Sequence, residues 1–552
     1  MKSRAMFLVL LLVGFAASSL SAQTADTTVS VEGGKIRGAA TDVAGVTLYK
    51  AVPFAAPPVG PNRWKAPQPV VPWTGVREGG AWPDRCSQLA SANLPGTFYF
   101  NEFYWDPSKD PKDSEDCLYL NVWAPQKPAG GTLPVMVFFH GGGNRHGNIS
   151  EVEFNAARLA AKGIIVVTPA YRLNLMGFLA LPGMQEYGAG NFAILDGVAS
   201  LKWVRQNIRA FGGDPGQVTI AGQSAGSRNV RTLMSTPLSK GLFQRAIMHS
   251  SPTVMAQPDK ANFVTLDEKT AAAAPVFEKL YPGKSLDELR KIPAQDFYQD
   301  DARAEQLFAA TSGRYAVIDG TVLTKTSVDL LRPGALDGVD VMLGTVADER
   351  TALDGAPDKQ MEIADFHAYW KKLLGEPLYA KYRFEQLYPA ATRSDAYRQH
   401  LKAQADMALE QNRIAGTVLK AQNPGSKVYV FYFDHPTPGR DREYYGAWHS
   451  SDLWYVLDSM RNAPGQRPWS PADFELADQA SSFWANFVKT GDPNGAGLPD
   501  WRQSERANDG AYLWIGEKST GSTSGSPYHG TRAENRNALF HDYQVRFYGV
   551  DR

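Results

Sequence analysis

Short apolar runs alternate with a longer amphipathic segment in the first half of the chain. The runs at 133–140 (LPVMVFFH), 162–172 (KGIIVVTPAYR) and 218–222 (VTIAG) are rich in β-branched and aromatic residues, which predicts strands buried on both faces of a sheet. Between the second and third runs, residues 191–213 carry apolar side chains at helical spacing and end at two glycines, which predicts a helix. This alternation predicts an α/β fold with a mostly parallel central sheet and helices on both faces.

The first 22 residues have the pattern of a secretory signal peptide. Lys2 and Arg4 precede an apolar run over residues 5–17, and small residues follow it. A membrane anchor is the alternative, but this run is shorter than the roughly 20 residues that a spanning helix requires. We therefore expect residues 1–22 to be cleaved, and residues 23–552 to form one domain of a secreted or periplasmic protein without a stable membrane anchor.

The composition favours a globular protein and argues against nucleic acid as a partner. Hydrophobic residues make up 43% of the chain and charged residues 21%, which is unlike a disordered chain. The 57 Lys and Arg residues equal the 57 Asp and Glu residues, so no overall positive field attracts phosphate groups. The oligomeric state stays open.

Two cysteines, Cys86 and Cys117, are the whole complement of the chain. An oxidising compartment allows them to pair, and closing this loop would add about 3 to 4 kcal/mol of stability by the chain-entropy estimate. A zinc site is not supported, because two cysteines without a nearby ligand cluster do not fill four coordination positions. We expect no metal.

Ser224 lies at the junction of the predicted strand 218–222 and a helix that begins with AGSRNV. Gly222 and Gly226 stand two residues to either side of it, which matches the GxSxG pattern of a nucleophile elbow. The glycines permit a tight turn, and the start of the helix directs backbone N–H groups at the site. The alternative is an ordinary turn with a capping serine.

The sequence HGGG at 140–143 directly follows the predicted strand that contains LPVMVFF. Glycines allow the backbone to approach a substrate closely, so the N–H groups of Gly142 and Gly143, together with that of Ala225, are candidates for an oxyanion hole. Each such donor could lower a reaction barrier by about 3 kcal/mol. A flexible loop after a strand is the alternative for this motif.

These motifs resemble those of the type-B carboxylesterases, the family that includes the cholinesterases. FGGDPGQVTIAGQSAG (211–226) is similar to the family's serine signature, and SEDCLYLNVWAP (114–125) is similar to its second signature. The similarity extends from residue 33 to residue 501. The resemblance implies an α/β-hydrolase fold in which large loop and helical insertions form a gorge, and it implies a disulfide between Cys86 and Cys117.

The resemblance also implies the remaining members of a catalytic triad with Ser224. His449 lies in GAWHSSDLWYVL (446–457), which is similar to the family's histidine loop, and Glu349 would supply the carboxylate. Asp348 is the adjacent alternative, and sequence alone does not separate the two. In such a serine hydrolase the histidine takes the proton of the serine while it attacks an ester carbonyl, and the carboxylate orients the imidazole. Neither a metal nor an organic cofactor is required.

Two groups of residues bear on the choice of substrate. Aromatic residues crowd the segment between the cysteines, which the resemblance places beside the gorge entrance, so Tyr104 and Trp105 are candidates to contact an apolar or aromatic ester. Trp448, the neighbour of His449 in the histidine loop, is a further candidate. Packing of these rings against the body of the protein is the alternative. Gln223 is a further candidate, because it places a neutral amide where relatives commonly have glutamate. The missing charge predicts a low preference for choline esters.

Neighbouring residues leave further alternatives open. Ser227 could narrow the site slightly, and Arg228 could pair with a carboxylate on the substrate or lie in an ordinary salt bridge on the helix. The same machinery could cleave amides or thioesters. A non-catalytic binding protein with this fold is the alternative from another class, although such relatives usually lack the serine or its partners.

Overall fold

The computed structural model describes residues 26–548, apart from 90–96, 104–110, 127–130, 185–187, 251–263, 299–300, 311–315, 337, 355–356, 440, 462–466, 507–509, 517–520 and 524–530. The expected signal peptide, Tyr104 and Trp105 lie outside the described residues.

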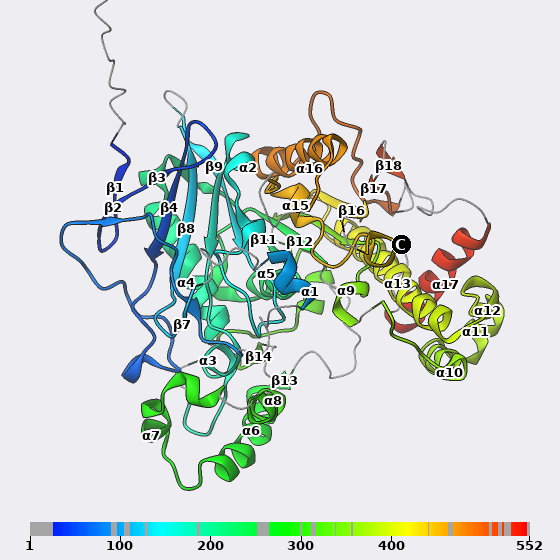
Figure 1. Ribbon diagram of the computed structural model, residues 1–552, viewed down its shortest axis with the longest axis horizontal. Coiled ribbons are helices and arrows are strands. Elements are labelled where there is room, and N and C mark those ends of the chain that lie inside the picture. Colours follow the sequence, from blue (N-terminus) through cyan, green and yellow to red (C-terminus); the bar gives the residue numbers. More distant parts are fainter. Residues whose placement is uncertain are drawn as a thin grey trace, which may run out of the picture.

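An eleven-stranded sheet forms the centre of the described structure (Figure 1). Its middle is parallel, in the order β10, β9, β11, β12, β15, β16, β17, and antiparallel strands complete both edges. The predicted mostly parallel sheet is therefore confirmed. The strands are β3 (Ala39–Ala40), β4 (Val46–Pro53), β8 (Tyr119–Pro125), β9 (Leu133–Phe139), β10 (Ile165–Pro169), β11 (Gly213–Gln223), β12 (Arg245–His249), β15 (Asp340–Val346), β16 (Val428–Asp434), β17 (Tyr512–Gly516) and β18 (Gly521–Thr523).

The apolar runs of the sequence become buried strands, as their composition predicts. β9, β10 and the end of β11 are fully buried. The helix predicted over 191–213 is α4 (Phe192–Asn207), which continues into a 3-10 turn and ends at Gly212 with a left-handed φ of 88°. Gly212 is suited to that position because it has no Cβ to clash in the left-handed conformation.

Two groups of helices pack on the sheet. The group α4, α5 (Ala225–Ser235) and α13 (Arg393–Gln422) contacts β11, β12, β15 and β16. The group α2 (Ala157–Ala161), α15 (Leu453–Val456) and α16 (Pro471–Thr490) packs together and contacts β4, β8, β9 and β11. The apolar side chains of these helices and of the strands form one large hydrophobic core.

Two smaller helical lobes have hydrophobic clusters of their own and extend from the sheet (Figure 1). The first contains α3 (Asn174–Phe178), α6 (Leu266–Leu280), α7 (Leu286–Lys291) and α8 (Asp301–Ala310). The second contains α10 (Ile363–Leu374), α11 (Glu376–Lys381), α12 (Phe384–Leu387) and α17 (Thr531–Tyr548), which pack on the start of α13.

The remaining elements are short. They form three small sheets and several single helical turns: β1 (Thr28–Val31), β2 (Gly34–Arg37), β5 (Val76–Glu78), β6 (Arg85–Cys86), β7 (Asp113–Ser114), β13 (Val264–Thr265), β14 (Val317–Ile318), α1 (Phe98–Phe103), α9 (Thr351–Asp354) and α14 (Arg442–Tyr445). Cys86 and Cys117 form a disulfide, so the structure contains the pairing that the resemblance implies. None of the helices in the described part of the chain combines the length and apolarity needed to cross a bilayer.

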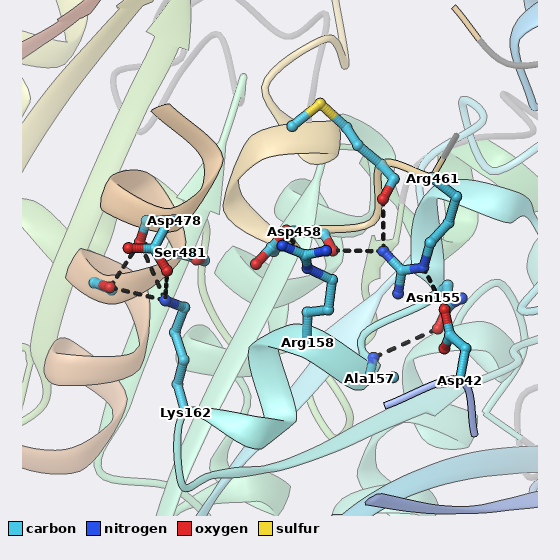
Figure 2. Close-up of polar contacts among 11 residues, drawn as sticks. Asp42, Asn155, Ala157, Arg158, Lys162, Asp458, Arg461, Asp478 and Ser481 are labelled. Carbon is cyan, nitrogen blue, oxygen red and sulfur yellow. Dashed lines mark hydrogen bonds and ion pairs between the residues drawn. The ribbon is translucent and has the colours of Figure 1, made fainter. Parts of the chain in front are cut away.

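Ion pairs from α2 and from the residue after it anchor the chain that follows α15 (Figure 2). Arg158 Nε lies 3.0 Å from Asp458 Oδ1, and Lys162 Nζ lies 2.6 Å from Asp478 Oδ1 on α16. Arg461 Nη1 donates to the Asp458 carbonyl at 3.0 Å, and its Nε lies 2.6 Å from Asp42 Oδ2 beside β3. The end of the α15 segment is therefore tied to α2 and to the edge of the sheet.

A buried ion pair fixes the chain after β10. Arg172 Nε and Nη2 donate to the two oxygens of Asp196 on α4 at 2.8 and 2.7 Å, and the Arg172 backbone N–H donates to Oδ2 at 3.0 Å. Both side chains are almost completely buried. This pairing joins the chain after β10 to α4 and holds Tyr171, the residue before Arg172, in place.

Asp196→Ala should lower the free energy of unfolding by about 3 to 5 kcal/mol, because it leaves the Arg172 guanidinium buried without its partner carboxylate. Urea denaturation of the purified variant measures this change. Asp478→Ala is the matched control, since its carboxylate is largely exposed and the surface pair with Lys162 should contribute about 1 kcal/mol or less. Equal losses of unfolding free energy in the two variants would contradict the greater contribution assigned to the buried Arg172–Asp196 pair.

Candidate active site

Ser224 occupies a strained turn between β11 and α5. Its φ of 55° and ψ of −116° lie in a region that serine rarely adopts. A Cβ at position 222 would lie 2.5 Å from the Gly226 carbonyl carbon, and a Cβ at position 226 would lie 2.0 Å from the Phe139 carbonyl oxygen. Both glycines are therefore required by backbone crowding, as a nucleophile elbow demands. The Ser224 N–H donates to the carbonyl oxygen of His249 at 2.9 Å, which fixes the turn to β12.

The predicted histidine and glutamate meet beside this turn. His449 Nδ1 lies 2.5 Å from Glu349 Oε2, and both side chains are buried. Glu349 Oε1 accepts hydrogen bonds from the Thr345 hydroxyl and from the Val346 N–H. Burial alone would raise the pKa of Glu349, but His449 and the hydrogen bond from Thr345 lower it overall. An ionised carboxylate accepts the Nδ1–H, so the imidazole presents the lone pair of Nε2.

A short parallel bridge brings the two loops into register. Asp348 pairs with Trp448, and the Asp348 N–H donates to the Ala447 carbonyl at 3.0 Å. The next residues on the two segments are Glu349 and His449, so the bridge sets them side by side. Glu349, just after β15, and His449, in the loop before α15, are thus brought together although they are 100 residues apart in the sequence.

Asp348, the alternative carboxylate, has a different environment. Its Oδ2 accepts the N–H of Ala447 at 3.0 Å, and a Cβ at position 446 would lie 2.1 Å from that same oxygen. Burial raises the pKa of Asp348. The structure therefore places Glu349 against the histidine, while Asp348 braces the backbone of the histidine loop.

The HGGG segment lies beside Ser224. A Cβ at position 141 would be 3.5 Å from Ser224 Cβ, and Gly142 and Gly143 have left-handed φ values of 92° and 67°. At position 142 a Cβ would lie 2.0 Å from the His146 carbonyl oxygen, so only glycine fits there. The Ala225 N–H is at the first position of α5. The three candidate oxyanion-hole residues therefore flank the serine from two segments.

Side chains that the motifs did not reveal hold this glycine loop. Asn144 and Asn229 exchange amide hydrogen bonds at 3.3 and 2.9 Å, which joins the loop to α5. The Tyr171 hydroxyl donates to the His140 carbonyl at 2.7 Å, and the two rings stack with centroids 4.4 Å apart. Burial lowers the pKa of His140 to about 4, so this ring is neutral at neutral pH. The loop is thereby positioned by buried contacts rather than by its own glycines.

The histidine loop is held from two further directions. The Tyr99 hydroxyl on α1 donates to the His449 carbonyl at 3.1 Å. On the other side, His249 Nδ1 lies 2.6 Å from Asp452 Oδ2, and the Trp484 indole N–H donates to His249 Nε2 at 2.9 Å. An indole only donates, so His249 Nδ1 carries the proton that Asp452 accepts. These contacts join long-range partners, which sequence motifs do not specify.

Of the three aromatic residues proposed to contact substrate, only Trp448 lies within the described residues, and it packs against other rings. Trp448 is fully buried, and its indole N–H donates to Thr437 Oγ1 at 2.6 Å. Its ring packs against Phe98, Tyr99 and Phe103 of α1 with centroids 5.0 to 5.9 Å apart. Trp448 and the described rings of the disulfide loop therefore pack the histidine loop, whereas Tyr104 and Trp105 lie outside the described residues.

The residues that depart from the family pattern directly precede or follow the Ser224 turn. Gln223 is buried, and its amide Nε2 lies 3.2 Å from His449 Nε2. Ser227 is fully buried, and Arg228 lies partly buried in the first turn of α5. Within the described ranges, no group of three or more histidine, cysteine, aspartate and glutamate side chains is arranged to hold a metal ion.

Comparison with known proteins gives one consistent result. Residues 25–535 match the model of the carboxylesterase family. The chain is 34% identical over 480 residues to para-nitrobenzyl esterase of Bacillus subtilis (strain 168), covering 84% of this chain and 90% of that protein. It is 30% identical over 516 residues to fumonisin B1 esterase of Sphingopyxis macrogoltabida, covering 90% and 88%. A solved structure of PNB esterase, 30% identical, aligns with a TM-score of 0.71 and covers 90% of this chain and 96% of its own.

The adjacent carboxylates should respond differently to removal of their charge. We expect Glu349→Gln to lower kcat for p-nitrophenyl acetate by a factor of about 10⁴, because the amide no longer holds the reactive tautomer of His449. Asp348→Asn should lower kcat by less than about 10-fold, since it keeps an oxygen that can accept the Ala447 N–H. Steady-state kinetics of the two variants provides the comparison, and a larger loss in Asp348→Asn would show that Asp348 orients the histidine.

Proposed function

The chain belongs to the carboxylesterase family and is a carboxylic-ester hydrolase of the serine type, and we propose that it acts through an acyl-enzyme formed on Ser224. The observation that carries this proposal is the buried His449–Glu349 pair beside the strained Ser224 turn. A serine hydroxyl is a weak nucleophile unless an adjacent base removes its proton. The pair would supply such a base, and the residue before Ser224, Gln223, has its amide Nε2 3.2 Å from His449 Nε2.

The proposed reaction needs only groups of this chain and water. The Ser224 oxygen attacks the ester carbonyl while its proton moves to His449 Nε2, and Glu349 stabilises the resulting imidazolium. The backbone N–H groups of Gly142, Gly143 and Ala225 are proposed to bind the oxyanion, each lowering the barrier by about 3 kcal/mol. His449 then protonates the leaving alcohol, and a water molecule repeats these steps on the acyl-enzyme.

We propose neutral esters with apolar or aromatic groups as the substrate class. The residue before the nucleophile is the neutral Gln223, so it offers no negative charge to a cationic alcohol group. The relative from Bacillus subtilis is named for a para-nitrobenzyl ester, which is neutral and aromatic. Tyr104 and Trp105 remain proposed contacts for such a group.

We also propose that the protein is exported. Residues 1–22 have the charged, apolar and small-residue regions of a secretory signal, and the disulfide between Cys86 and Cys117 is suited to an oxidising compartment. By the same reasoning, residues 23–552 would form the single mature domain.

Replacing the nucleophile tests the proposed mechanism. Ser224→Ala should lower kcat for both p-nitrophenyl acetate and p-nitrophenyl octanoate by a factor of about 10⁴ or more, because no acyl-enzyme can form. Ser227→Ala is the matched control, since this serine follows Ser224 by three residues but is fully buried. Hydrolysis that persists in Ser224→Ala at the wild-type rate would contradict the proposal.

A charged alcohol group tests the proposed substrate class. We expect kcat/KM for butyrylcholine to be no higher than for its neutral isostere 3,3-dimethylbutyl butyrate, because Gln223 supplies no carboxylate to attract the trimethylammonium group. Release of acid followed at constant pH measures both substrates. A preference of more than about 10-fold for the choline ester would contradict the proposed class.

A further inference from the structure

Gln223 contacts the nitrogen that the proposed mechanism uses as its base. The Gln223 amide Nε2 lies 3.2 Å from His449 Nε2, and both side chains are buried. Among the described residues, the Ser224 hydroxyl makes no hydrogen bond. The hydrogen bonds of Ser224 are made by its backbone N–H and its backbone carbonyl. In this structure His449 Nε2 is therefore hydrogen-bonded to the Gln223 amide and not to the Ser224 hydroxyl.

The direction of this hydrogen bond follows from the other side of the ring. His449 Nδ1 faces the Glu349 carboxylate, which only accepts, so Nδ1 carries the proton of the neutral imidazole. Nε2 then has a lone pair and no hydrogen. The amide NH₂ of Gln223 only donates, so its N–H points at that lone pair.

The surroundings give the amide little freedom to lie elsewhere. The amide oxygen lies against Gly141, the first glycine of HGGG, and would be 2.6 Å from a Cβ at that position. Gln223 is only 2% exposed, and its backbone is in the last position of β11. Because Gly141 has no Cβ, the Gln223 amide fits between the glycine loop and His449.

We propose that Gln223 is a further catalytic residue, whose amide N–H competes with Ser224 for the lone pair of His449 and keeps the imidazole neutral at lower pH. This inference rests on the proposed function. When the proton of Ser224 moves to Nε2 and the serine oxygen bonds to the carbonyl carbon, Nε2 gains a hydrogen. The amide N–H must then withdraw, because two N–H groups facing each other repel. Gln223 thus opposes protonation of His449 and extends activity toward acidic pH at the expense of serine activation.

Other ionisable groups lie on the elements packed around His449, and they remain constant when residue 223 alone is changed. They come from the end of β15, the glycine loop, α1, the end of β12 and the chain around α15: Asp348, Glu349, Arg350, His140, Arg145, His146, Tyr99, Glu102, His249, Asp452 and Arg467. A difference between variants at position 223 therefore reports the amide.

The test is the pH dependence of Ser224 phosphonylation by a p-nitrophenyl phosphonate, which needs no knowledge of the natural ester. The rate of p-nitrophenol release is measured from pH 5 to 9 for the wild type and for Gln223→Met, which keeps the length and volume but has no N–H donor. We expect the midpoint of the acid limb to rise by about half to one pH unit in Gln223→Met, since a hydrogen bond of this kind has about that effect. The plateau rate should rise severalfold, because Ser224 no longer competes for the lone pair.

Two further variants keep the result interpretable. Gln223→Asn retains the amide but is one methylene shorter, so it should behave like Gln223→Met if the contact matters, and it serves if Gln223→Met fails to fold. Ser227→Ala should leave the acid limb unchanged. Tryptic mapping confirms that the phosphonate is on Ser224 in each protein.

The possible results separate this inference from the proposed function. An acid limb that stays in place in both Gln223 variants would overturn the inference and assign Gln223 to packing alone. A midpoint that falls would overturn it as well, because it would mean that the amide oxygen accepts a hydrogen bond from the imidazolium. A wild type that is not labelled at Ser224 would overturn the proposed function and this inference with it.

Discussion

Backbone crowding at the turn between β11 and α5 is the constraint on which the rest of the site depends. The strand end, the helix start and the end of β9 approach so closely that a Cβ at either Gly222 or Gly226 would overlap backbone atoms. This crowding holds Ser224 in a left-handed conformation that its side chain would otherwise avoid. The parallel centre of the sheet provides the rigidity, because β9 and β12 both pair with residues 219–222 at the end of β11.

The base is positioned by a second device, the pairing of two loops through Asp348 and Trp448. Three further contacts fix the histidine loop: the Tyr99 hydroxyl, the buried His249–Asp452 pair and the ring of Trp448 packed on α1. Ion pairs on α2 secure the chain beyond α15. The supports come from segments that are distant in the sequence, so the imidazole is held by the tertiary structure.

The sequence predicts the centre of the sheet because buried strands and amphipathic helices have distinct patterns, as 133–140 and α4 show. It predicts Ser224 because a short local motif encodes the turn. Glu349 and His449 could be proposed only through resemblance to a family, since nothing local to either residue marks its partner. The Asp348–Trp448 bridge, the Asn144–Asn229 pair and the Gln223–His449 contact could not be predicted, because each depends on how distant segments pack. The resemblance supplied which residues meet, and the structure supplies what holds them.

If ester cleavage proceeds through an acyl group carried on Ser224, that group can be trapped and located. A hindered ester such as p-nitrophenyl pivalate slows deacylation, so the reaction can be stopped in acid during turnover and the peptides analysed by mass spectrometry. We expect a pivaloyl group on the peptide that contains Ser224, in an amount approaching one per protein molecule. Release of p-nitrophenol with no acylated peptide, or with the acyl group on another residue, would contradict it.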